Sequence, residues 1–96
     1  MHIRQGDLLF VRGTVPAEAQ EIADGVLARG EATGHTHRVR PGAAVALLAA
    51  GMAYVRAIQE AYVDHEEHAT VILPPGEWAV HRQREYRPDG WRQVAD

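Results

Sequence analysis

Short apolar runs that end at glycine or proline are the feature of this sequence that most restricts its fold. Residues 7–12 form one such run before Gly13, and residues 69–73 form another before Pro74-Pro75-Gly76. Runs of this length between turn residues are typical of β-strands rather than helices. The sequence therefore predicts an all-β fold: residues 1–96 form a single small antiparallel β-barrel or sandwich.

The middle of the chain fits two structures. Apolar residues from Val45 to Tyr62 recur at a near-helical spacing, and this stretch is rich in alanine, the best helix former. The alternative is a hairpin of residues 45–50 and 53–58 around Gly51. Because glycine inside a helix costs about 1 kcal/mol relative to alanine, the hairpin is the preferred interpretation.

Three further turn signals predict where the chain reverses. Asp24-Gly25 suits a type I′ hairpin between residues 21–23 and 26–28. Pro75-Gly76 suits a type II turn, and it would pair residues 71 and 73 with residues 80 and 78. A last turn is expected at Pro88-Asp89-Gly90, which would bring Trp91 and Val94 back onto the body.

The composition indicates the cellular compartment of the protein and the kinds of partner it can have. The chain has 96 residues and no cysteine, so an intracellular protein is expected. The first residues show no apolar leader, and the longest apolar run, Ala43 to Ala50, is too short to span a bilayer. The net charge of −3 argues weakly against general nucleic-acid binding. We therefore expect a cytoplasmic protein with no membrane or DNA partner. Its light core suggests that a metal ion or a homodimer partner adds stability.

Four of the six histidines lie in two short segments, His35-Thr36-His37 and His65-Glu66-Glu67-His68. On a strand, residues i and i+2 project from the same face, so the first pair would point the same way. Two ligands from one strand and one or two from a neighbouring loop suit a metal site with three or four protein ligands. The expected ligands are His35, His37 and His68, with His65 as the fourth.

The expected metal is a transition-metal ion, zinc first, with iron, nickel or copper as alternatives. Glu67 is a candidate general base, because an open coordination position would hold a water molecule that the metal acidifies. Each histidine segment also has a simpler explanation. The first is typical of an exposed strand, and the second of a solvated polar turn.

Named catalytic motifs fit poorly. The histidines of His65-Glu66-Glu67-His68 are three residues apart rather than four, which excludes the zinc-protease motif. The early HxH and the later Pro-x-Gly turn are similar to those of cupins. However, Arg38-Val39-Arg40 stands where cupins place a glutamate, so a cupin-like metalloenzyme is an alternative by analogy only.

The C-terminal region carries the basic and aromatic residues of the chain. Arg82, Arg84, Tyr86 and Arg87 form a candidate surface for a protein or RNA partner. The simpler explanation is a solvated strand whose arginines pair with nearby glutamates. A non-enzymatic interaction module is therefore the alternative to a metal-binding protein.

The chain also resembles a group of small bacterial and phage proteins of unassigned activity. The likeness rests on residues 4–7, 30–37, 64–68, 73–76 and 82–86, which read RQGD, GEATGHTH, DHEEH, LPPG and RQREY. It spans nearly the whole chain. The resemblance implies an all-β fold with a hairpin in the middle segment, and it supports the location of the site without naming an activity.

Overall fold

The computed structural model describes residues 2–87 and 90–93, with side chains through Gln83. Within these ranges the chain forms strands, turns and loops. The described residues include no helix that is long and apolar enough to cross a membrane. The strands are β1 (His2–Gln5), β2 (Leu8–Arg12), β3 (Gln20–Glu21), β4 (Val26–Arg29), β5 (Thr36–Val39), β6 (Ala44–Ala49), β7 (Met52–Ala57), β8 (Ala61–Asp64), β9 (Val71–Leu73), β10 (Gly76–Arg82), β11 (Arg84–Arg87) and β12 (Gly90–Gln93).

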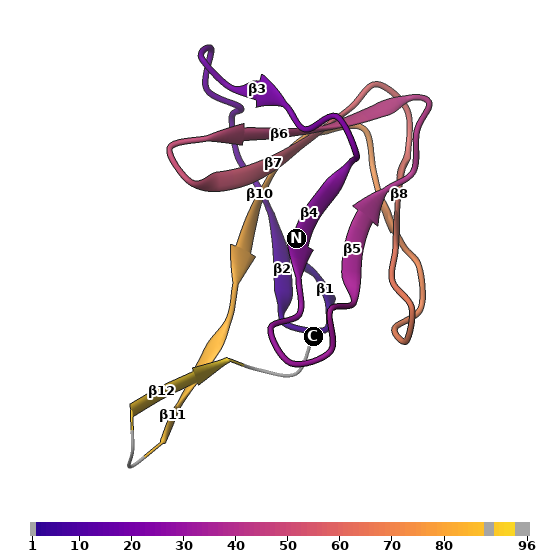
Figure 1. The fold of residues 1–96 in the computed structure, drawn as a ribbon. Helices are drawn as coiled ribbons and strands as arrows, with labels where there is room; N and C mark the ends of the chain where they lie inside the picture. The colour runs from indigo at the N-terminus through magenta and orange to yellow at the C-terminus, as the bar shows by residue number, and fades with distance from the viewer. Residues whose placement is uncertain (1, 88–89, 94–96) are drawn as a thin grey trace.

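The strands form two open antiparallel sheets and a separate hairpin (Figure 1). The larger sheet has six strands in the order β1-β2-β10-β7-β6-β3, and the smaller has four in the order β4-β5-β8-β9. The β11–β12 hairpin extends away from this body in Figure 1. The predicted all-β class is confirmed. The turn expected at residues 88–90 falls partly outside the described residues, as do the side chains of Trp91 and Val94.

The middle segment is a hairpin, as predicted. Strands β6 and β7 pair from Ala44 opposite Ala57 to Ala49 opposite Met52. The two residues between them, Ala50 and Gly51, have φ angles of 49° and 78°. Positive φ at both central positions is the geometry of a type I′ turn, which matches the twist of the paired strands.

The hairpin predicted at Asp24-Gly25 is wrong. Strand β3 pairs with β6 in the larger sheet, whereas β4 pairs with β5 in the smaller. The chain therefore crosses between sheets at this turn. Gly25 has a φ of 73°, and a Cβ there would lie 2.8 Å from the Val39 carbonyl oxygen, so the crossing requires glycine.

The hairpin predicted around Pro75-Gly76 is also wrong. Strand β9 pairs with β8, whereas β10 pairs with β2 and β7, so the two strands flanking this turn belong to different sheets. His81 consequently lies opposite Leu9 of β2. The apolar residues assigned to this region still reach the core, because Leu73, Trp78 and Val80 are buried.

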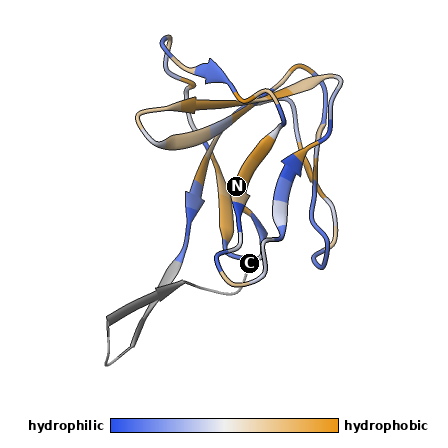
Figure 2. Ribbon diagram, in the orientation of Figure 1, coloured by the Kyte–Doolittle hydropathy of each residue, from blue (hydrophilic) through white to orange (hydrophobic). Residues whose placement is uncertain are grey.

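The core is formed by apolar side chains from both sheets. Its largest buried members are Trp78, Phe10, Leu8 and Leu73. Figure 2 shows hydrophobic residues along β4, β6 and β7, and hydrophilic residues on β3, on β5 and in the loop after β8. Among the residues whose side chains are described, three polar or charged ones are buried with this core, namely Gln5, Asp7 and His37. A buried polar group needs a partner to offset its desolvation, so these three residues mark a specialised part of the interior.

Candidate metal site

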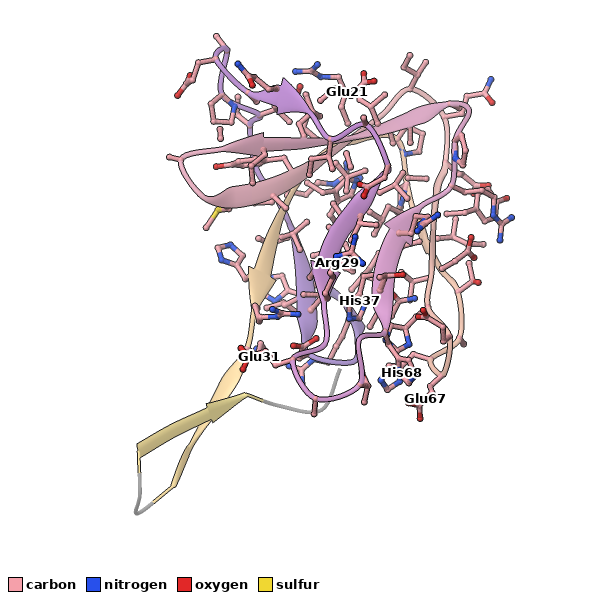
Figure 3. The ribbon with its side chains drawn as sticks, in the orientation of Figure 1. Glu21, Arg29, Glu31, His37, Glu67 and His68 are labelled. Carbon is pink, nitrogen blue, oxygen red and sulfur yellow. The ribbon has the colours of Figure 1, made fainter. Side chains whose placement is uncertain are left out.

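The register of β5 against β8 brings the two histidine segments together. Val39 lies opposite Val63, and Arg38 lies opposite Asp64. Continuing this antiparallel register by one residue places His37 against His65. Figure 3 shows His37 within the body beside β5, with His68 and Glu67 lower in the view, in the loop that follows β8.

The imidazole rings of His35, His37 and His68 lie around that of His65. The centroid of its ring is 4.4 Å from that of His37, 4.7 Å from that of His68 and 5.4 Å from that of His35. His37 is fully buried, whereas the side chain of His35 is 26% exposed. The structure thus brings the four predicted ligands together at a place where the interior opens toward solvent.

The His65 ring is part of a tight turn. Its Nδ1 accepts hydrogen bonds from the backbone N–H groups of Glu67 and His68, at 3.0 and 3.1 Å. A nitrogen that accepts these bonds carries a lone pair, so a neutral His65 has its proton on Nε2. Coordination through Nε2 would therefore require the proton to leave this atom and the turn to give up its two bonds.

His37 is in the opposite tautomer because of Gln5. The Gln5 Nε2 group donates to the carbonyl oxygens of Val63 and Ala69, at 2.9 and 3.0 Å, and this fixes the orientation of the amide. The Gln5 Oε1 atom then faces His37 Nδ1 at 2.9 Å, and it can only accept. His37 therefore carries its proton on Nδ1 and a lone pair on Nε2, an arrangement common in metal-ligating histidines.

Asp7 and Arg82 complete the buried polar group. The Nε2 atom of His37 lies 3.3 Å from Asp7 Oδ1, and Asp7 Oδ2 lies 3.0 Å from Arg82 Nε. Arg82 also donates from Nη2 to the carbonyl oxygen of Arg29. Burial, together with the charge of His65, lowers the pKa of His37 to about 4, against the opposing effect of Asp7. Near neutral pH His37 is therefore uncharged, and the ion pair here is that of Asp7 with Arg82.

Two glutamates hold the outer part of the site. Glu67 Oε1 lies 2.8 Å from His35 Nδ1, and Glu66 Oε1 accepts the backbone N–H of Thr36 at 2.9 Å. This backbone hydrogen bond lowers the pKa of Glu66. A carboxylate at Nδ1 favours the tautomer of His35 with a lone pair on Nε2. Glu67 thus has an orienting contact in the structure, and its role as a base stays a prediction.

As placed, these side chains do not yet form a coordination shell. Within residues 2–87 and 90–93, no group of three or more His, Asp or Glu residues is arranged to hold a metal ion. The rings are close, but their nitrogen atoms are engaged with Gln5, Glu67 and the turn after β8. Ion binding would therefore require some of these side chains to turn.

His81 and the residues of the predicted partner-binding surface lie elsewhere. His81 is exposed on β10, away from the four rings. Arg82 was predicted as part of a partner-binding surface, yet its guanidinium points to Asp7 and the side chain is only 26% exposed. The side chains of Arg84, Tyr86 and Arg87 are outside the described part of the chain, so the rest of that surface stays a prediction.

Sequence reasoning missed two residues of the site, Gln5 and Asp7. Both lie near the N-terminus, at the end of β1 and just before β2, within the RQGD stretch that carried the resemblance to other small proteins. That stretch was the available signal. Nothing local to these residues indicates that they are buried, because polar residues beside a glycine usually occupy exposed turns.

The fold and the site define a small all-β domain of two open sheets with a buried polar centre at one end. The model of a family described as "Domain of unknown function (DUF8820)" matches residues 4–83. The chain therefore belongs to this family, and the match includes both histidine segments, Gln5 and Asp7, but not the β11–β12 hairpin. The chain matches no curated protein and no solved structure.

Proposed function

We propose that this domain binds one divalent transition-metal ion, zinc first, at the four imidazoles of His35, His37, His65 and His68. The observation that carries the proposal is the tautomer and the burial of His37. Its Nδ1–H is used by Gln5, and its Nε2 lone pair lies in a fully buried position beside His65. A buried lone pair next to further imidazoles is a donor set that suits zinc.

The spacing of the rings agrees with shared coordination. Two imidazoles bound to one tetrahedral ion at ordinary zinc–nitrogen distances have ring centroids about 5 Å apart. The three separations from His65 range from 4.4 to 5.4 Å. His37 is the fixed donor, because strand β5 and Gln5 hold it. His35, His65 and His68 lie outside the strands and can turn toward it.

Ion binding has a specific consequence for the turn after β8. When His65 coordinates through Nε2, its remaining proton moves to Nδ1, which can then no longer accept a hydrogen bond. The backbone N–H groups of Glu67 and His68 lose this partner. Glu67 is exposed, so water can replace the bond to its N–H group. Binding is therefore expected to move the amide resonances of these two residues.

The number of ligands decides the chemistry. Four imidazoles close the shell and give a structural ion, whereas three leave a position for water. A metal-bound water has a pKa near 7, and Glu67 at the mouth would then be placed to accept its proton. A cupin-like hydrolytic activity would require this open form.

Metal analysis of untagged protein, purified without added metal, tests the proposal. We expect about one first-row transition-metal ion per chain, or saturable binding of Zn²⁺ or Co²⁺ to the metal-free protein. His37→Asn should weaken binding about 100-fold or more, whereas His81→Asn, at an exposed histidine away from the site, should leave it unchanged. A wild-type protein with neither bound metal nor saturable binding would refute the proposal.

A further inference from the structure

The contact between Asp7 and His37 indicates a further ligand for the proposed metal ion. Both side chains are fully buried, and His37 Nε2 makes no hydrogen bond to any described residue. It faces Asp7 Oδ1 at 3.3 Å. Gln5 Oε1 accepts from His37 Nδ1, so His37 Nε2 and Asp7 Oδ1 are two possible metal-donor atoms that face each other in the buried interior.

A divalent cation between these two atoms could be bound by both of them. Their separation matches what one ion requires. Donor atoms at ordinary zinc distances are about 3.4 Å apart at a tetrahedral angle and about 3.0 Å apart at a right angle. The observed 3.3 Å is within this range. His37 Nε2 and Asp7 Oδ1 are thus spaced to bind one ion without any movement of strand β5 or of the turn between β1 and β2 that carries Asp7.

We infer that Asp7 is a ligand of the metal ion proposed above, which makes the centre a mixed imidazole–carboxylate site. The inference depends on the proposed function, since it names a further ligand of the same ion. A buried carboxylate adds a hard, anionic donor to the imidazoles. This set favours divalent ions such as Zn²⁺, Fe²⁺ and Co²⁺, and it disfavours Cu⁺, which prefers sulfur ligands.

Arg82 has a positioning role in this arrangement. It holds Asp7 Oδ2 at 3.0 Å and donates to the Arg29 carbonyl oxygen on β4, so Asp7 would bind through Oδ1 alone. The positive charge of Arg82 also offsets part of the charge of the buried carboxylate. Partners of this kind orient metal ligands and affect affinity through them.

The experiment compares Zn²⁺ affinity and the optical spectrum of bound Co²⁺ in wild type and Asp7→Asn. Asp24→Asn is the matched control, because Asp24 is an exposed aspartate in a distant turn. We expect Asp7→Asn to weaken Zn²⁺ binding about 100-fold or more and to change the Co²⁺ spectrum, and Asp24→Asn to change neither. Unchanged affinity and spectrum in Asp7→Asn would overturn the inference and leave the proposed function intact. A proton rather than a metal ion in the gap would give this same result.

Folding must be separated from binding, because Asp7→Asn leaves the Arg82 charge without its carboxylate. Asp7→Asn/Arg82→Gln removes both charges, and it should bind as weakly as Asp7→Asn while retaining the wild-type circular dichroism spectrum. A wild-type measurement is independent of both variants. With carboxyl-labelled aspartate, added Zn²⁺ should shift the ¹³C resonance of a buried carboxylate, and the absence of any aspartate shift would overturn the inference. Absence of Zn²⁺ and Co²⁺ binding by wild type would instead overturn the proposed function.

Discussion

Replacing Gln5 with leucine tests the centre of the polar network. The Gln5 side chain makes two hydrogen bonds as a donor and one as an acceptor, and the residue is 2% exposed. In Gln5→Leu, the Ala69 carbonyl lies on an exposed residue and can turn to water. The Val63 carbonyl and the His37 Nδ1–H are buried and cannot turn to water. Two buried groups without partners cost about 1–3 kcal/mol each, and the more apolar leucine offsets part of this.

The expected net loss is therefore about 3 kcal/mol in the free energy of unfolding of the metal-free protein. Urea unfolding followed by circular dichroism measures it. Gln20→Leu, an exposed glutamine on β3, should change stability by no more than about 0.5 kcal/mol. A loss below about 1 kcal/mol in Gln5→Leu would show that these hydrogen bonds are not made, and the reasoning on His37 would fail with them.

The same variant changes an NMR observable that packing alone would leave untouched. Long-range ¹H–¹⁵N correlation spectra distinguish the two tautomers of a neutral histidine. In wild type we expect His37 to carry its proton on Nδ1, and in Gln5→Leu we expect this preference to weaken. Wild-type protein with the proton on Nε2 would contradict the network as described.

Two further predictions concern stability. In metal-free protein, the folded state binds a proton at His37 only near its pKa of about 4, whereas the unfolded state does so near 6.5. Stability from this group is therefore full above pH 6.5 and falls by about 3 kcal/mol as the pH drops to 4. Asp7, Arg82 and His65 face His37, so the measured quantity is the difference between wild type and His37→Asn in how the free energy of unfolding depends on pH. A difference that does not vary with pH would contradict the prediction. At the turn between β6 and β7, Ala50 has a φ of 49°, so Ala50→Gly should raise the melting temperature by relieving a penalty of about 1 kcal/mol, and a lowered melting temperature would refute this.

The sequence was sufficient to predict the all-β class and the hairpin in the middle segment. Alternation along a strand predicts that His35 and His37 share a face, whereas in the structure His35 lies just before β5 and only His37 is on the strand. The rings of both lie near that of His65, which follows β8. The cost of placing Gly51 inside a helix correctly favoured a hairpin over a helix in the middle of the chain.

The sheet topology could not be read in the same way. Turn residues such as Asp24-Gly25 and Pro75-Gly76 fix how the backbone bends, but they do not fix whether the next strand pairs with the previous one. That choice depends on distant packing. Strand β10, which carries the buried Trp78, pairs with β2 and β7 rather than with its sequence neighbour β9.

The burial of Gln5 and Asp7 has the same kind of cause. Each is buried because residues far away in sequence cover it and supply its partners. Val63 and Ala69 accept the hydrogen bonds of Gln5, and Arg82 pairs with Asp7. Such contacts at long sequence separation leave no local pattern, so these residues look like ordinary polar turn residues in the sequence.

The position of Asp7 relative to the histidines has a mechanical consequence. Asp7 lies between two strands of the larger sheet, and His37 lies on a strand of the smaller one. An ion bound by both residues would link the larger sheet to the smaller one. At a free concentration one hundred times its dissociation constant, an ion adds about 2.7 kcal/mol to the stability of the state that binds it. Removing the ion with a chelator should then speed amide hydrogen exchange first in the segments around Asp7 and His37, before the β6–β7 hairpin is affected.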